Sequence, residues 1–206
     1  MDEIVRQAMA KWPNVPHCYG WLALDARGNW RMRDERAQNL NLPGDRIHNA
    51  TLLAFINRNY LCDAQGRWYF QNGPQRVYVN LEATPFILRT DPEHGFLLHT
   101  GEPLAAVDAA WMTDAGLLVF GSGEKIAQID DRDMAQCLAQ LRFQGAPADD
   151  ERLLAWLAQP SDDAGLTLEF GGRQVPVAHL AQGELATRFG FVARPQPDAG
   201  AAAAHQ

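Results

Sequence analysis

The stretch INRNYLCDAQGRWYFQNGPQRVYVN gathers side chains that are well suited to recognising an anion. Among its arginines, amides and tyrosines are Asn57, Arg58, Asn59, Tyr60, Tyr69, Gln71, Asn72, Gln75, Arg76 and Tyr78. Arginine donates paired hydrogen bonds to carboxylates and phosphates, and amides and hydroxyls add further contacts. The stretch indicates either a binding surface or, as the simpler alternative, a solvated sheet face with ordinary cross-strand pairs.

Catalytic motifs based on serine or on a phosphate loop are absent from the sequence. Ser122 and Ser161 are its only serines, and neither lies in a G-x-S-x-G elbow. The segment GSGEK around Ser122 ends a predicted strand and lacks the remaining spacing of a phosphate-binding loop. We therefore interpret it as a hairpin turn.

The sequence also gives little support for a catalytic Cys–His pair, a histidine metal site or catalytic carboxylates. Cys18 follows His17, but neighbours on a strand point to opposite faces, so the pair is not expected to meet. His94 and His99 supply two metal ligands without a third. The acidic clusters at residues 130–133 and 149–151 precede predicted helices, where carboxylates cap backbone amides. The sequence predicts no catalytic residue, no metal site and no cofactor, and paired catalytic carboxylates remain the alternative.

The elements that would position these side chains begin with two similar hexamers. DARGNW spans Asp25–Trp30 and DAQGRW spans Asp63–Trp68. Aspartate can start a turn through a side-chain hydrogen bond, glycine adopts a positive φ, and tryptophan can pack on the core. No third copy follows at the same interval, so the hexamers predict two hairpins and no repeat array.

Hydrophobic periodicity predicts the other elements. Helices are expected at residues 2–12, 49–60, 131–143, 148–159 and 181–189. Strands are expected at residues 21–24, 29–33, 60–62, 67–71, 75–81, 86–90, 95–100, 105–113, 116–122 and 125–129, with a last hairpin at 166–180. The close spacing after residue 85 favours an antiparallel meander that curls into a barrel or a small sandwich.

Two segments that contain the hexamers carry a resemblance to known proteins. PHCYGWLALDARGNWRM and FINRNYLCDAQGRWYFQNGPQRVYVNLEATPFIL resemble uncharacterised proteobacterial proteins known only as domains of unknown function. They are also similar, more distantly, to a related two-domain family with a Cys-Gly start, two hairpins and an APF strand. Cys18, Gly20, Gly28, Trp30 and the ATPF of residues 83–86 hold the corresponding places. The resemblance covers residues 12–130, implies an α+β domain followed by a mostly β domain, and implies no activity.

The composition is that of an ordinary globular protein, with 47% hydrophobic and 21% charged residues. A net charge of −7 disfavours nucleic acid and anionic membranes as partners. No apolar run is long enough to span a bilayer, and no export signal opens the sequence. Three cysteines without metal spacing fit the reducing cytoplasm, which is the predicted location.

We expect an α+β fold with an N-terminal domain at residues 1–82, a mostly antiparallel β-rich domain with a helical pair at 83–195, and a disordered tail at 196–206. The leading functional hypothesis is a binding or regulatory module for a small anionic ligand or a peptide, near an interdomain groove. Its expected contacts are Arg58, Tyr69, Gln71, Arg76 and Tyr78. An enzyme with an unfamiliar carboxylate site, or a protein that self-associates through the WYFQ hairpin edge, are the alternatives.

Overall fold

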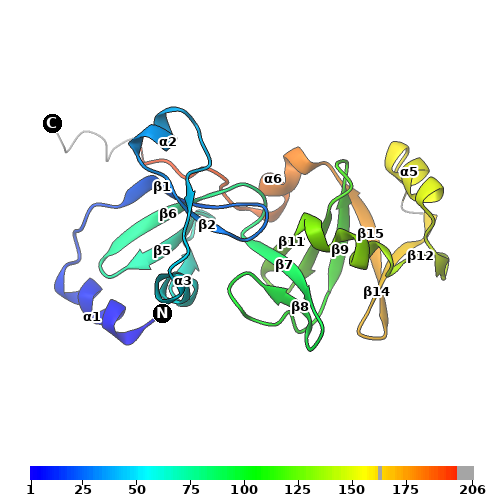
Figure 1. The fold of residues 1–206 in the computed structure, drawn as a ribbon, viewed down its shortest axis with the longest axis horizontal. Coiled ribbons are helices and arrows are strands. Elements are labelled where there is room, and N and C mark those ends of the chain that lie inside the picture. Colours follow the sequence, from blue (N-terminus) through cyan, green and yellow to red (C-terminus); the bar gives the residue numbers. More distant parts are fainter. Residues whose placement is uncertain (162–163, 199–206) are drawn as a thin grey trace. The chain divides into compact units, whose positions relative to one another are not determined.

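A computed structural model describes residues 1–161 and 164–198 of the chain (Figure 1). Two compact units make up the fold, which is α+β and rich in strands. Unit 1 contains Met1–Asp25, Asn29–Ala83 and the chain from Gly190 onward, and unit 2 contains Ala26–Gly28 and Thr84–Phe189. The domains expected at 1–82 and 83–195 remain a proposal about separately folding parts, and residues 199–206 of the expected tail lie outside the described residues.

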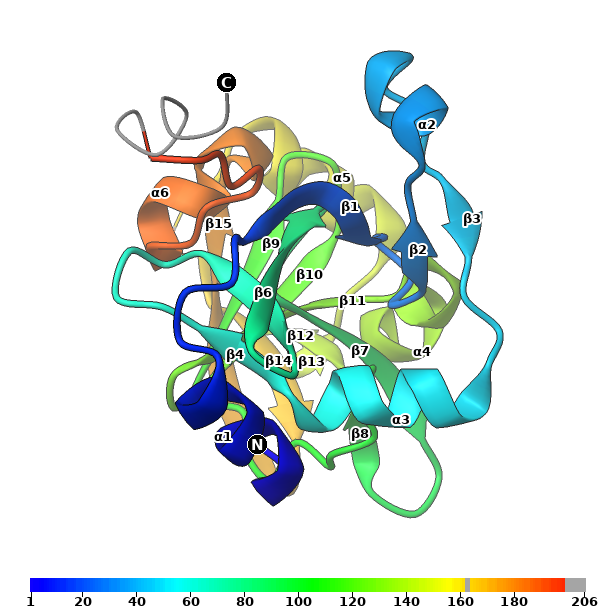
Figure 2. The same ribbon diagram turned by 90° about the vertical axis from the view of Figure 1, so that its left-hand side faces the viewer.

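Unit 1 is built on a six-stranded mixed sheet in the order β3-β2-β1-β6-β5-β4. The strands are β1 (Cys18–Leu24), β2 (Trp30–Met32), β3 (Asp45–Arg46), β4 (Tyr60–Cys62), β5 (Trp68–Asn72) and β6 (Gln75–Leu81). Its helices are α1 (Glu3–Lys11), α2 (Glu35–Asn39) and α3 (Ala50–Arg58). β1 and β6 pair in parallel, whereas the other neighbours are antiparallel. Figure 2 shows α2 and β3 beside β2, at one edge of this sheet.

Both hexamers form the predicted turns. The Asp25 carboxylate accepts a hydrogen bond from the Asn29 amide at 2.8 Å, and Asp63 accepts one from the Arg67 amide at 3.0 Å. Gly28 and Gly66 adopt positive φ angles of 77° and 76°. These turns close the β1–β2 and β4–β5 hairpins, and the two hairpin predictions are confirmed.

Large side chains from the strands and from helix α3 fill the core of unit 1. Trp30 is 2% exposed, and Leu24, Ile56 and Val79 are buried with it. Asn49 caps α3 by accepting a hydrogen bond from the Leu52 amide at 3.0 Å, as the sequence predicts. The apolar face of α3 then packs on β5, where the rings of Phe55 and Phe70 lie 5.3 Å apart.

Unit 2 contains a nine-stranded mixed sheet in the order β13-β12-β14-β15-β9-β10-β11-β7-β8. The strands are β7 (Phe86–Asp91), β8 (Gly95–Leu98), β9 (Ala109–Thr113), β10 (Leu118–Ser122), β11 (Lys125–Ile129), β12 (Leu141–Phe143), β13 (Ala146–Pro147), β14 (Leu166–Phe170) and β15 (Arg173–Leu180). β7 pairs with β11, and β9 with β15, in parallel. The sheet is mostly antiparallel, as expected, and these two parallel pairings depart from the predicted antiparallel meander.

The sheet of unit 2 is open, so the expected barrel does not form among the described strands. One reason lies at the edge strand β8, whose backbone is occupied by the chain that follows it. Leu98 donates to the Glu102 carbonyl at 2.8 Å, and Leu104 donates to the Phe96 carbonyl at 2.9 Å. These hydrogen bonds use the edge that closure would require.

The helical segments of unit 2 are shorter than expected. They are η1 (Asp131–Asp133), α4 (Met134–Leu138), α5 (Asp150–Ala158), η3 (Gln182–Glu184) and α6 (Leu185–Phe189). The helix predicted through residue 143 is wrong beyond α4, because Leu141 and Phe143 pair with β14 and are almost completely buried. Asp130 and Asp149 cap η1 and α5, which confirms the capping role predicted for the acidic clusters.

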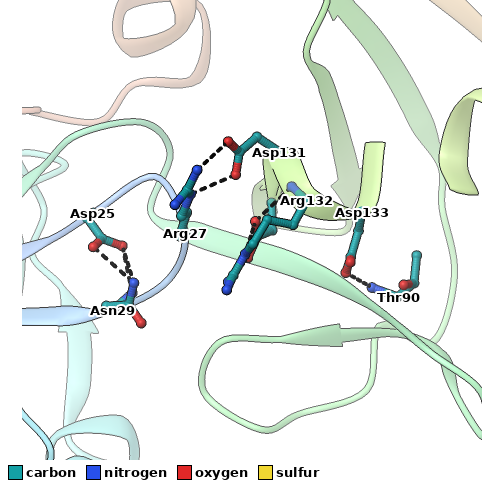
Figure 3. Close-up of polar contacts among 8 residues, drawn as sticks. Asp25, Arg27, Asn29, Thr90, Asp131, Arg132 and Asp133 are labelled. Atoms are coloured by element: carbon teal, nitrogen blue, oxygen red, sulfur yellow. Dashed lines mark hydrogen bonds and ion pairs between the residues drawn. The ribbon is translucent and has the colours of Figure 1, made fainter. Parts of the chain in front are cut away.

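Residues Ala26–Gly28 of the first hairpin turn belong to unit 2, and Arg27 lies among them. Its guanidinium makes two 2.8 Å hydrogen bonds to the Asp131 carboxylate (Figure 3). In the same cluster, Arg132 pairs with Asp130, and Asp133 accepts a 2.7 Å hydrogen bond from the Thr90 amide. These acidic side chains thus have structural partners.

Across the described residues, no helix combines the length and the apolar character needed to cross a membrane.

Candidate functional site

A pocket of about 490 Å³ opens within unit 1. It is bordered by β1, β2 and β6, by α2 and the loop after it, and by the C-terminal segment that returns to unit 1. Its lining residues are Tyr19, Gly20, Ala23, Leu24, Asp25, Arg31, Arg33, Gln38, Asn41, Leu42, Pro43, Asn80, Leu81, Glu82, Arg194 and Gln196.

Strand register explains the floor of the pocket. Ala23 on β1 lies opposite Arg31 on β2 and opposite Asn80 on β6, so the three residues form one row across the sheet. Paired residues of neighbouring strands project to the same face. The short Ala23 side chain leaves room between two larger polar ones, and the hollow therefore follows from a small residue in the middle of the row.

Arg31 is the paired cation of this row. Its Nε donates a 2.7 Å hydrogen bond to the carboxylate of Asp25, which is itself buried. Nη1 of Arg31 also donates to the Gly44 carbonyl at 3.1 Å. The first hexamer thus places a neutralised ion pair at one side of the pocket.

Arg33 is a buried cation held by carbonyl groups. Only 8% of the residue is exposed, and its guanidinium donates to the carbonyls of Leu42 at 3.0 Å and Ala37 at 3.3 Å. No carboxylate of the described chain lies within ion-pair distance of Arg33. The Asp34 side chain caps α2, and Asn41 adopts a φ of 50° in the loop that supplies the Leu42 carbonyl. The pocket therefore keeps one positive charge without a matching carboxylate.

Arg194 and Gln196 reach the pocket from the C-terminal segment, and both are exposed. Three arginines and two carboxylates, Asp25 and Glu82, thus line the site. The ionised side chains of the lining therefore carry a net charge of one positive unit, three arginines minus two carboxylates. The Asn80 Oδ1 atom is buried and accepts no hydrogen bond from the described residues, which leaves one acceptor unused at the floor.

A tyrosine–arginine cluster adjoins the pocket at Tyr19. The Tyr19 and Tyr78 rings stack at 4.6 Å, and the Arg67 guanidinium lies 4.9 Å from the Tyr78 ring. The Tyr78 hydroxyl donates to the Asp63 carboxylate at 3.1 Å. Burial alone would raise the pKa of Asp63, but hydrogen bonds from Arg67, Gln65 and Tyr78 hold it below its usual value.

The structure brings several of the predicted contact residues together, although none of the five lines the pocket of unit 1. Tyr69 and Tyr78 are register partners with rings 5.7 Å apart, and Arg76 stacks on the Tyr69 ring at 4.6 Å. Gln71 lies opposite Arg76. Arg58 pairs with Asp2 at 3.2 Å at the end of α3.

The alternative interpretation of this stretch as a solvated sheet face is wrong for Tyr69 and Gln71. Tyr69 is 6% exposed, and Gln71 and Tyr78 are also buried. The reason is that β5 lies inside the sheet, with both of its faces covered. The WYFQ segment of β5 also presents no free edge, because β4 and β6 pair with β5 on either side. A binding role for the five predicted residues and self-association both stay predictions.

His17 and Cys18 do not have the properties of a thiolate–imidazole pair. Burial raises the pKa of the Cys18 thiol, which disfavours the reactive thiolate. Burial, followed by the nearby Arg76 and Arg67 cations, lowers the pKa of His17. The His17 ring lies edge-on to Tyr78 at 5.8 Å, so its role is packing.

The sequence reasoning missed Arg31, Arg33, Asn80 and Arg194. In the sequence WRMRD, Arg31 and Arg33 are two residues apart, so an extended strand would place both on one face. This alternation could have identified them from the sequence. Asn80 and Ala23 meet only through the parallel pairing of β1 and β6, which no local pattern reveals. Arg194 enters through the return of the chain to unit 1, which is equally invisible in the sequence.

The fold and the pocket define a two-unit α+β protein with a polar, arginine-containing cavity in its first unit. The family model DUF2944, described as "Protein of unknown function (DUF2946)", matches residues 1–196, and the chain belongs to this family. The predicted membership in a family of unknown function is confirmed, whereas a proteobacterial origin stays a prediction.

Two solved structures are similar to this chain. One is a DUF1285 family protein from Silicibacter pomeroyi DSS-3, with 13% identity, a TM-score of 0.48, and coverage of 86% of this chain and 96% of that chain. The other is a DUF1285 family protein from Shewanella baltica OS155, with 14% identity, a TM-score of 0.37, and coverage of 54% and 85%. Among curated proteins, none matches this chain.

Proposed function

We propose that the protein is a binding module for a small anionic molecule, which sits in the pocket of unit 1 above Ala23. The observation that carries the proposal is the charge of the lining. Arg31 is neutralised by Asp25, but Arg33 has only carbonyl acceptors among the described residues. A buried or half-buried arginine binds a carboxylate or phosphate strongly, since both partners of the hydrogen bond are ionised.

The size and composition of the pocket fit the same role. Small-molecule pockets commonly enclose roughly 300–1,000 Å³, and this one has about 490 Å³. Amide side chains from Gln38, Asn41 and Asn80 surround the arginines. Such groups can orient a ligand that carries hydroxyl, amine or carbonyl groups beside its anionic group.

The test is a melting-temperature screen of the whole chain with sodium phosphate, citrate, succinate and adenosine monophosphate, each compared with sodium chloride at equal ionic strength. A ligand that binds only the folded state stabilises it by RT ln(1 + [L]/Kd), which is about 2.7 kcal/mol at one hundred times Kd. We expect at least one of these anions to raise the melting temperature beyond the chloride control.

Two variants show whether such an effect arises in the pocket. Ala23→Met fills the floor and should abolish the stabilisation, because the longer side chain occupies the ligand volume. Arg173→Gln removes an exposed arginine of unit 2 and should leave the stabilisation unchanged. An anion effect that persists in Ala23→Met, or no effect of any anion on the wild type, would refute the proposed site.

A further inference from the structure

The chain from Gly190 to Asp198 returns to unit 1 after the whole of unit 2. It contains no helix or strand, yet Phe191 is 6% exposed and Pro195 is also buried. We refer to Gly190–Asp198 as the strap. Its two buried side chains anchor an otherwise irregular segment to unit 1.

Two backbone hydrogen bonds join the strap to strands and turns of unit 1. Leu81, at the end of β6, donates to the Ala193 carbonyl at 2.8 Å. Val192 donates to the Gly66 carbonyl, in the turn of the second hexamer, at 2.9 Å. The Leu81 amide therefore reports directly whether the strap is docked.

The second hexamer is shaped to receive the strap. A Cβ atom at position 66 would lie 2.0 Å from the Gly190 carbonyl oxygen, so a residue with a side chain cannot occupy this turn while the strap is docked. Arg67, the next residue, forms a 2.8 Å ion pair with Asp198. The Asp198 side chain is 77% exposed, and such an ion pair holds its partners only weakly.

The docked strap also supplies part of the candidate site. Arg194 and Gln196 line the pocket, and Arg194 directly follows the residue whose carbonyl accepts the Leu81 hydrogen bond. Leu81 and Glu82 line the same pocket. Undocking would therefore remove the Arg194 cation from the pocket wall.

We infer that docking of the strap completes the anion site, so that anion binding and strap docking stabilise each other; this inference rests on the function proposed above. The strap opens while the six-stranded sheet of unit 1 stays folded, since its contacts are few and irregular compared with the strand pairing. Because the coupling is reciprocal, an anion that contacts Arg194 favours the docked strap, and a variant that undocks the strap weakens anion binding by the same factor.

The first experiment measures amide hydrogen exchange at Leu81 in the full chain without added anion. Gly66→Ala introduces the clash with Gly190. Gly116→Ala is the matched control, because Gly116 has the same φ of 76° and its added Cβ would meet only a Leu157 methyl group at 3.9 Å. We expect Leu81 exchange at least tenfold faster in Gly66→Ala than in the wild type, and no such change in Gly116→Ala.

The amides of β5 separate strap opening from unfolding of the sheet. They should keep their slow exchange in Gly66→Ala. If Leu81 and the β5 amides instead exchange at one common rate in the wild type, the strap does not open separately and the inference is wrong. Should Gly66→Ala fail to fold, Asp198→Asn removes only the exposed ion pair, and a twofold to fivefold faster Leu81 exchange is the expected result.

The second experiment titrates inorganic phosphate and citrate into the wild type, Gly66→Ala and Gly116→Ala. We expect the anion that binds the wild type to slow Leu81 exchange, and to bind Gly66→Ala at least tenfold more weakly than Gly116→Ala. Equal binding to the two variants would overturn the coupling while leaving the proposed function intact. If neither anion binds the wild type, the proposed function fails for these anions, and the coupling fails with it.

Discussion

His99 should make the stability of the protein fall steeply in mild acid. Burial in unit 2, with a smaller contribution from the Arg89 cation, lowers the pKa of its imidazole to about 3. Nδ1 of the ring accepts a 3.2 Å hydrogen bond from the Ile87 amide, and the His99 amide donates to the Ile87 carbonyl at 2.8 Å. The native state therefore holds a neutral ring, since protonated Nδ1 could not accept this hydrogen bond.

The pKa difference sets the size and the pH range of the effect. The unfolded chain binds a proton at this ring with the ordinary pKa of 6.5, while the folded chain does not until about pH 3. The stabilising contribution is thus complete above pH 6.5 and is lost progressively as the pH falls from 6.5 to 3. Between pH 7.5 and pH 5 this linkage removes roughly 2 kcal/mol of the unfolding free energy.

Urea unfolding of the wild type and of His99→Asn at pH 7.5 and pH 5 measures this contribution. The asparagine Oδ1 can replace Nδ1 as acceptor but does not titrate, so the variant should lose roughly 2 kcal/mol less than the wild type on acidification. His48→Asn changes an exposed histidine of unit 1 and should behave like the wild type. Identical acid losses in the wild type and His99→Asn would refute the assignment of the effect to His99.

Two further predictions concern the pocket and the cysteines. Arg31→Met leaves the buried Asp25 carboxylate without its 2.7 Å partner, so urea unfolding should show a loss of about 3 kcal/mol; a loss below about 1 kcal/mol would contradict a structural ion pair. Burial raises the pKa of the Cys137 thiol to about 12, whereas Cys62 is exposed, so a thiol reagent at pH 8 should modify Cys62 in the folded protein and leave Cys137 intact. Mass spectrometry of the labelled peptides distinguishes the two, and labelling of Cys137 at the rate of Cys62 would contradict the burial.

Local chemistry made much of the fold predictable. The Asp and Gly of each hexamer determine a turn within a few residues, and Asn49 determines a helix start in the same way. Leu141 and Phe143 were misassigned because both pair with β14, more than twenty residues further along the chain. Long-range pairing of this kind overrides local helix propensity.

The candidate site was harder to predict than the fold, because its residues meet through non-local contacts. Tyr69, Gln71 and Tyr78 have suitable chemistry, but both faces of β5 are covered and Tyr78 is almost completely buried. Arg33 follows β2 and Asn80 lies on β6, two strands that are both neighbours of β1 but not of each other, and Arg194 comes from the strap. A sequence window can rank side-chain types, but it does not contain the distances that make a cavity.

The position of the strap along the chain also bears on synthesis at the ribosome. The Leu81 amide is made long before the Ala193 carbonyl that accepts its hydrogen bond, with Thr84–Phe189 of unit 2 translated in between. At roughly 5–20 residues per second, the nascent first unit waits roughly 5–20 s for this partner. During that interval residues 84–189 can fold while the pocket still lacks Arg194, so the pocket gains this cation only after those residues have been translated.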